Sequence, residues 1–328
     1  MKCSREGNRT ADKNVHKYYG VSGKLRGVSP LRKDNNMNKK LISLIAGAAI
    51  VAAATGCSGT ATSSVAGTSS AAGTSASEAS STAAEELSGT LSMNGSTSME
   101  KVIKAVNGAF MEKNKGVTVN LNLTGSGTGI QEASEGKCDI GNSSRKLKDE
   151  EAEKLDATVV GLDGIALVVN PANKLEDITL EDLAKVYSGE ITNWKELGGD
   201  DKSIVVIGRE DGSGTRDGFE SIVMGDKEPK YAQELESTGS VINAVATTDG
   251  AIGYASLANV DETVKALKIG GIEATEENVK SGAYEVQRPF ICATLKGSDN
   301  KLVKAYLDFI LSEEGQALVL AQGAVPVK

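Results

Sequence analysis

A short run of glycine and hydroxyl residues next to an arginine could bind an anion. It extends from Arg209 to Thr215 (REDGSGT) and follows an apolar, β-branched run at 204–207 that predicts a buried strand. A helix that begins after such a turn has unpaired N–H groups at its N-terminus, where the helix dipole also favours negative charge. Ser213 and Thr215 add hydroxyl donors, and Arg209 adds a guanidinium group. The segment therefore predicts an oxyanion site.

Two other segments have the same order of strand, Gly/Ser turn and helix. A strand leads into residues 94–98 (NGSTS) and another leads into residues 124–129 (TGSGTG), and helical patterns follow both turns. Because such turns connect strands to helices in many α/β proteins, any one of them also fits a purely structural role. Three of them together with Arg209 favour several helix N-termini directed at one small anion.

The sequence argues against the common catalytic sites. The only histidine is His16, and there is no Gly-x-Ser-x-Gly elbow and no Gly-x4-Gly-Lys-Ser/Thr phosphate loop. The glycines at 125, 127 and 129 do not have the spacing of a dinucleotide-binding loop. We therefore expect no catalytic residue, no cofactor and no metal site. A phosphate-handling hydrolase is the remote alternative.

The first 88 residues are expected to lie outside the fold. Residues 1–36 are polar, basic and without periodicity, and they are interpreted as a leader upstream of the true start. Residues 37–56 have the charged start, apolar run and small-residue end of a signal peptide. The ending Ala-Thr-Gly before Cys57 resembles a lipobox, which predicts lipidation of Cys57, although an ordinary cysteine after a secretory signal is the alternative. Residues 57–88 then form a Ser/Ala/Thr/Gly-rich tether.

Charge argues against nucleic acid as a partner. Residues 1–56 hold eleven of the 36 Lys and Arg residues and three of the 44 Asp and Glu residues, so the remainder has a net charge of −16. Nucleic-acid binding depends on neutralising phosphates with basic side chains. An acidic chain must hold an anion by local dipoles and by individual arginines.

Alternating strand and helix patterns predict an α/β fold with largely parallel sheets. Strands are expected near 90–94, 117–123, 138–143, 164–169, 204–208, 251–254 and 290–295. Helices are expected at 180–187 with Thr179 as the N-cap, after Gly214, and at 302–310. Cys138 and Cys292 are expected to be buried small residues, with a disulfide as the open alternative.

Several motifs in a fixed order resemble the PstS family, the phosphate-binding lipoproteins of ABC-type phosphate importers. They are residues 94–97 (NGST), 125–127 (GSG), 139–145 (DIGNSSR), 189–194 (GEITNW), 209–215 (REDGSGT), 250–254 (GAIGY) and 315–316 (GQ). The resemblance implies a type II periplasmic-binding-protein fold, in which two α/β lobes are joined by a two-strand hinge. Lobe 1 is expected to comprise 89–170 and 287–328, and lobe 2 to comprise 171–286.

The resemblance also implies the ligand-binding residues. They are Ser96, Thr97, Ser98, Ser126, Ser144, Arg209, Asp211, Ser213, Gly214 and Thr215. Asp211 is expected to orient Arg209. Many family members have an aspartate where this chain has Ser144, which leaves selectivity against sulfate open. Arg145 is expected either to add positive charge near the site or to form a surface ion pair.

The function that the resemblance implies is capture of inorganic phosphate and its delivery to an ABC permease and its ATPase. The protein is expected to be a monomer that is lipid-anchored to the cell membrane and faces the extracytoplasmic side. Binding of another oxyanion such as sulfate is the alternative within the same class. A surface adhesin or a sensor subunit is an alternative from another class.

Overall fold

The computed structural model describes residues 86–328, which belong to one compact unit. The predicted leader, signal peptide and Cys57, and nearly all of the tether, lie outside these residues. The strands are β1 (Ser88–Gly95), β2 (Gly116–Leu123), β3 (Ile140–Ser143), β4 (Leu155–Val169), β5 (Asp177–Ile178), β6 (Val205–Arg209), β7 (Gln233–Leu235), β8 (Ala251–Ser256), β9 (Lys265–Ile269) and β10 (Gln287–Leu295). The α-helices are α1 (Glu100–Lys113), α2 (Ser126–Ser134), α3 (Asp149–Lys154), α4 (Leu180–Ser188), α5 (Gly214–Val223), α6 (Thr238–Thr247), α7 (Glu276–Ser281), α8 (Lys301–Ile310) and α9 (Glu313–Ala321). Short 3-10 helices are η2 (Thr97–Met99), η3 (Trp194–Leu197) and η4 (Leu257–Asn259).

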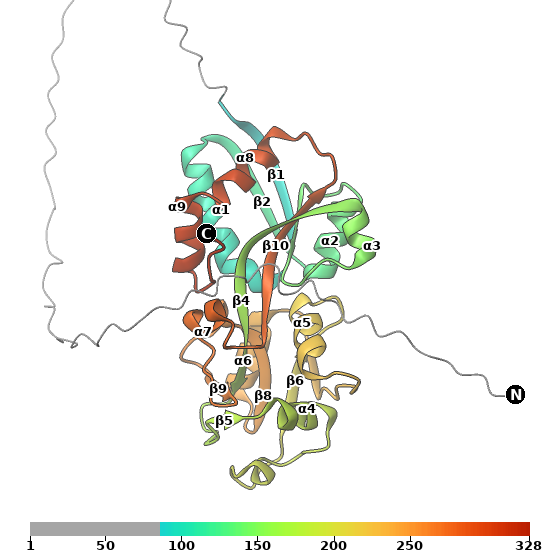
Figure 1. Ribbon diagram of the computed structural model, residues 1–328, viewed down its shortest axis with the longest axis vertical. Coiled ribbons are helices and arrows are strands. Elements are labelled where there is room, and N and C mark those ends of the chain that lie inside the picture. The colour runs from blue at the N-terminus through green and yellow to red at the C-terminus, as the bar shows by residue number, and fades with distance from the viewer. Residues whose placement is uncertain (1–85) are drawn as a thin grey trace, which may run out of the picture. The chain divides into compact units, whose positions relative to one another are not determined.

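The strands form two lobes that share one continuous path of pairing, β2-β1-β3-β10-β4-β8-β6-β7. Lobe 1 contains β1, β2 and β3 with helices α1, α2, α3, α8 and α9. Lobe 2 contains β5 to β9 with helices α4 to α7. Figure 1 shows the two lobes connected by β4 and β10, which run side by side through both of them. This arrangement is the type II periplasmic-binding-protein fold that was predicted.

The connecting strands correct two details of the sequence interpretation. The strand expected near 164–169 is the second half of β4, a strand of 15 residues. β4 pairs with β10 and, from Ile165 onward, also with β8. These pairings are antiparallel, whereas β1–β2, β1–β3 and β6–β8 are parallel. The sheets are therefore mixed, because the two strands that cross between the lobes run in opposite directions.

Each lobe has its own hydrophobic core. In lobe 1, α1 and α8 pack on the sheet through an edge-on contact between Phe110 and Tyr306, whose ring centroids are 5.2 Å apart. In lobe 2, Phe219 of α5 stacks on Tyr254 of β8 at 4.3 Å. The helices that cover each sheet are thereby held against it, and their N-termini are fixed relative to the strands that precede them.

The local predictions fit the observed elements where a cap or a buried core residue defines them. Thr179 caps α4 by accepting a hydrogen bond from the N–H of Asp182, and Gly189 ends the helix at a φ of 74°. Cys138 and Cys292 are both buried and unpaired, so the alternative of a disulfide between them is wrong. None of the helices among the described residues has the length and apolar character of a membrane span.

Candidate functional site

Four helices begin between the lobes, two from each. Helix α1, extended at its start by η2, and helix α2 belong to lobe 1, whereas α5 and α6 belong to lobe 2. Ser98 Oγ lies 2.7 Å from Thr215 Oγ1 and 3.0 Å from Thr238 Oγ1, and these hydrogen bonds join the starts of α1, α5 and α6. The N–H of Thr238 donates to Thr97 Oγ1 at 3.2 Å. The helix N-termini therefore meet at one place in the interlobe cleft.

Seven buried hydroxyl side chains line this place, and we call them the hydroxyl cluster. Its members are Ser96, Thr97, Ser98, Ser126, Ser144, Thr215 and Thr238. Within it, Ser96 Oγ donates to Ser144 Oγ at 2.8 Å, and the N–H of Ser144 donates to Ser126 Oγ at 3.1 Å. Gly214 of lobe 2 closes against this part, since a Cβ atom there would lie 2.3 Å from Ser126 Oγ and 2.9 Å from Ser144 Oγ. The sequence predicted every member except Thr238.

Arg209 contributes a buried positive charge from the end of β6. Its side chain donates to the carbonyls of Leu235 and Glu236, both at 2.9 Å, and to Thr238 Oγ1 at 3.3 Å. Only 1% of Arg209 is exposed, and no carboxylate forms an ion pair with it in the described part of the chain. Burial lowers the pKa of Arg209 to about 10, so it remains a cation at neutral pH. An anion in the cleft would compensate this charge.

Arg288 brings a second guanidinium to the same cluster, and the sequence interpretation missed it. Its Nη1 donates to Ser144 Oγ at 3.2 Å, while Nε and Nη2 donate to Asp163 Oδ2 at 3.1 and 2.9 Å. Arg288 and Asp163 face each other in register on β10 and β4. Burial lowers the pKa of Arg288, and the carboxylate of Asp163 opposes that change.

The predicted role of Asp211 is wrong. Its side chain is 96% exposed and pairs with Arg216 at 3.1 Å, whereas Arg209 is held by backbone carbonyls. The turn after β6 directs this carboxylate to solvent instead of back toward the strand. Ser213 is buried, and its hydroxyl caps α5 by accepting from the N–H of Arg216.

Arg145 links the lobes at the edge of the cleft. It pairs with Glu151 of α3 through Nη1 at 2.7 Å and with Asp217 of α5 through Nε at 2.7 Å. Burial raises the pKa of Glu151, but hydrogen bonds from Arg145 and from the N–H of Lys148 outweigh it and hold this pKa below its usual value. Of the two expectations for Arg145, an ion pair is the one observed, although the guanidinium is buried and the pair spans two lobes.

Backbone and amide contacts reinforce this closure. The N–H of Gly127 in lobe 1 donates to the carbonyl of Gly212 in lobe 2 at 2.9 Å. Asn259, which follows β8, donates through its side chain to the carbonyl of Ser98 at 2.8 Å. The structure is therefore in a closed arrangement in which both lobes contact the same cluster.

Donors outnumber acceptors in this cleft. Two guanidinium groups, seven hydroxyls and the N–H groups of four helix starts surround a site where the carboxylate of Asp163 is already bound by Arg288 and Ser256. Such an arrangement suits a small anion with several acceptor oxygens. Residues 86–328 contain no group of three or more acidic, Cys or His side chains placed to hold a metal ion.

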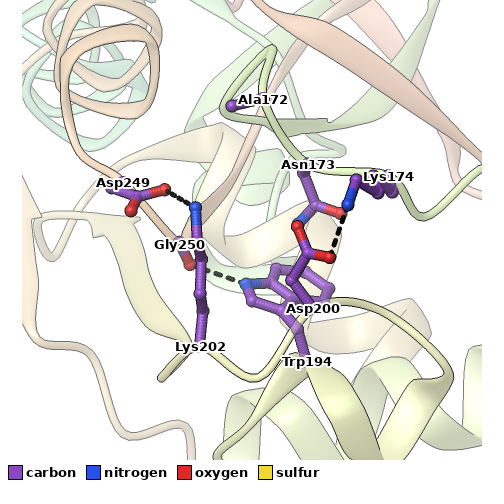
Figure 2. Close-up of a pocket in the computed structure, with 8 residues that line it drawn as sticks. All are labelled: Ala172, Asn173, Lys174, Trp194, Asp200, Lys202, Asp249 and Gly250. Atoms are coloured by element: carbon purple, nitrogen blue, oxygen red, sulfur yellow. Dashed lines mark hydrogen bonds and ion pairs between the residues drawn. The ribbon is translucent and has the colours of Figure 1, made fainter.

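A second group of charged side chains lies in lobe 2 around Trp194. Lys202 pairs with Asp249 at 2.9 Å, and Lys174 pairs with Asp200 at 2.8 Å. Figure 2 shows both pairs beside the indole ring. The indole N–H donates to the carbonyl of Gly250 at 2.9 Å. The cavity that these residues line has a volume of about 10 Å³, room for one water molecule. We call this the Trp194 pocket.

Two of the residues that build the cleft were missed for different reasons. Thr238 follows a short strand and is the first residue of the apolar helix α6, in the segment 237–240 (STGS). The same pattern of strand, hydroxyl/glycine turn and helix could have identified it. Arg288 carries no local signal, because its partner Asp163 lies 125 residues away.

Comparison with known proteins gives one consistent relationship. A PBP superfamily domain, PBP_like_2, matches residues 58–314. The phosphate-binding protein PstS of Bacillus subtilis (strain 168) is 36% identical over 244 residues, which cover 72% of this chain and 80% of that protein. A crystal structure of a putative phosphate ABC transporter substrate-binding protein with bound phosphate from Clostridium perfringens is 42% identical, with a TM-score of 0.70, and covers 73% of this chain and 100% of that one. An ABC-type phosphate transport receptor from Vibrio cholerae is 31% identical, with a TM-score of 0.61, and covers 72% and 99% of the two chains.

Proposed function

This chain belongs to the PstS family of phosphate-binding proteins, and we propose that it captures inorganic phosphate between its lobes and delivers it to an ABC phosphate importer. It is a transport receptor of the extracytoplasmic binding-protein class and not an enzyme. Phosphate supplies four oxygens, which can accept hydrogen bonds from both lobes at once.

The observation that carries the proposal is the charge of Arg209. This guanidinium is buried among hydroxyls and carbonyls, without a carboxylate partner in residues 86–328. Burying an unpaired charge is costly unless a counter-charge neutralises it. A phosphate ion beside Arg209 provides that counter-charge and draws lobe 2 toward lobe 1.

We assign the ligand contacts to both walls of the cleft. From lobe 1, Thr97 and Ser98 donate their backbone N–H groups and hydroxyls, and Ser126 adds its hydroxyl. From lobe 2, Arg209 donates its guanidinium. The remaining contacts are assigned to Ser96, Ser144, Ser213, Gly214, Thr215 and Thr238.

The assembly in the cell follows from the same assignment. We infer that lipidation of Cys57 anchors the protein to the outer face of the cell membrane and that the Ser/Ala/Thr/Gly-rich segment up to residue 88 links this anchor to the binding unit. The closed lobes then present phosphate to a permease and its ATPase. One copy of the chain contains both walls of the cleft and is sufficient for binding, so we expect the protein to act as a monomer.

Calorimetric titration of the purified protein with inorganic phosphate tests the proposal. We expect one site per chain with a dissociation constant in the micromolar range or below, about −8 kcal/mol or better. A thermal-shift series with phosphate, arsenate, sulfate and molybdate ranks the ligands. Failure of phosphate to bind, or turnover of a generic phosphoester, would contradict the assignment.

A further inference from the structure

We propose that Arg288 is a second guanidinium of the anion site and makes the cleft select doubly charged tetrahedral anions. The cleft would then bind the phosphate dianion better than the monoanion, and sulfate would compete with phosphate. This inference rests on the proposed function, because it concerns the same cleft.

The first step is the sum of charges at the hydroxyl cluster. Arg209 and Arg288 both touch it, through Thr238 and Ser144 respectively. Asp163 is the one buried carboxylate in contact with either guanidinium among the described residues. The two arginines and Asp163 together have a net charge of +1. One negative charge on the ligand would neutralise it if the helix dipoles are left out of the sum. Those dipoles add further positive potential from four helices, which favours a second negative charge on the ligand.

Other charged groups near the cleft do not change this balance. Glu210, next to Arg209, attracts it electrostatically, but its side chain is only half-buried and forms no ion pair with Arg209 in the structure described, so solvent screens this attraction. Tyr254 accepts the N–H of Arg209, and burial raises the pKa of this phenol to about 12, so it stays neutral. Arg145 is matched by Glu151 and Asp217 at the cleft edge.

The second step concerns acceptors. The monoanion of phosphate carries two P–OH groups and the dianion one, and each needs an oxygen to accept its hydrogen. Asp163 is already fully used as an acceptor, because it takes two hydrogen bonds from Arg288, one from Ser256 at 2.8 Å and one from the backbone N–H of Ala258.

The hydroxyl groups of Ser144 and Ser126 also act as acceptors toward the protein, which leaves them as donors toward a ligand. Ser144 Oγ accepts from Ser96 Oγ and from Arg288 Nη1, so both of its lone pairs are used. Its hydrogen can be donated to Ser126 Oγ, 3.3 Å away, or to a ligand. Ser126 Oγ accepts the N–H of Ser144. Arg288 therefore turns Ser144 into a donor, and the cleft offers donors to unprotonated oxygens. Sulfate carries no proton and therefore satisfies these donors at least as well as the phosphate dianion does.

The test is titration of the wild-type protein with phosphate at about pH 6 and about pH 8, on either side of the second ionisation of inorganic phosphate, which lies near neutral pH. Residues 57–328 contain no histidine, so no side chain with an ordinary pKa titrates in this interval. We expect the apparent dissociation constant to fall roughly tenfold between the two pH values, in step with the rise in the dianion fraction of inorganic phosphate. We also expect sulfate to displace phosphate at about pH 6.

Two variants test whether the pH dependence and the competition by sulfate depend on the contacts around Arg288. Ser144→Asp places a carboxylate acceptor against Arg288 and should abolish both the pH dependence and the competition by sulfate. Arg288→Gln keeps a donor toward Ser144 and removes the charge, which should have the same two effects if the variant folds. Lys202→Gln, which removes a cation in the Trp194 pocket, serves as the matched control and should behave as wild type.

The outcomes separate this inference from the function on which it rests. Equal affinity for phosphate at both pH values together with no displacement by excess sulfate would overturn the role of Arg288 and leave phosphate capture intact. A pH dependence that persists unchanged in Ser144→Asp would also overturn it. No binding of phosphate at either pH would instead overturn the proposed function.

Discussion

The interlobe cleft and the Trp194 pocket both gather charged side chains, but they differ in burial and in charge balance. In the cleft, Arg209 is almost fully buried and has no carboxylate partner among residues 86–328. In the Trp194 pocket, each lysine has its own aspartate, and the side chains of Lys202 and Asp249 are 41% and 69% exposed. The cleft therefore has an excess of positive charge, whereas the charges of the Trp194 pocket are balanced.

This difference explains why charge alone does not identify a binding site. An exposed, matched pair contributes about 0–1 kcal/mol and makes no demand for a ligand. A buried, unmatched cation costs several times more, and an anion is the group that removes the cost. Substitutions that remove a charge or a hydrogen-bond donor from the cleft, with matched substitutions outside it, test this difference.

Removing the unmatched charge should have the largest effect. Arg209→Ala deletes the guanidinium and leaves a bound phosphate without its main counter-charge, so affinity should fall by about 2–5 kcal/mol. Calorimetry measures this loss. Lys202→Ala is the control, because it removes a cation of similar size from the matched pair and should leave phosphate affinity unchanged. Equal losses in both variants would refute the distinction between the two regions.

Removing a shared donor should have an intermediate effect. The hydroxyl of Thr238 contacts Thr97, Ser98 and Arg209, so Thr238→Val removes a hydrogen-bonding group at the point where the lobes meet. We expect phosphate affinity to fall by about 1–2 kcal/mol, with the fold retained because the shape is conserved. Thr247→Val, at the opposite end of α6, should bind phosphate like wild type. Wild-type affinity in Thr238→Val would remove this residue from the site.

Weakening the edge of the cleft should have the smallest effect. Asp217 pairs with Arg145 across the lobes, and the Asp217 side chain is 35% exposed, so screening by solvent limits its contribution to about 0.5–1 kcal/mol. Asp217→Asn should release phosphate about two- to fivefold faster, which stopped-flow displacement measures. Asp249→Asn in the Trp194 pocket should leave the release rate as it is. An unchanged rate in Asp217→Asn would show that this ion pair does not hold the lobes closed.

The parts of the site that the sequence predicted are those with local causes. The turns before α1, α2 and α5 join a strand to a helix within a few residues, and their glycines and hydroxyls are visible in the chain. Thr238 has the same local pattern, but it follows the three-residue strand β7, which is too short to stand out by periodicity.

The errors have non-local causes. Arg288 on β10 pairs with Asp163 on β4, and nearly all residues of lobe 2 lie between them in the sequence. The sequence near either residue therefore does not indicate its partner. Asp211 has the correct spacing for contact with Arg209, yet the direction of the turn decides where its side chain points. The mixed character of the sheets likewise follows from strands that cross between lobes and cannot be deduced from each strand alone.

The position of Arg288 and Asp163 opposite each other on the two connecting strands affects the order in which an ion is captured. A rotation of one lobe against the other about these strands leaves the two residues together, so the charge of Arg288 belongs to the pivot and not to either moving wall. Arg209, by contrast, is carried on lobe 2. An arriving ion should therefore bind first to Arg288 and lobe 1. Closure of lobe 2 should then bring Arg209 into contact with an ion that is already bound.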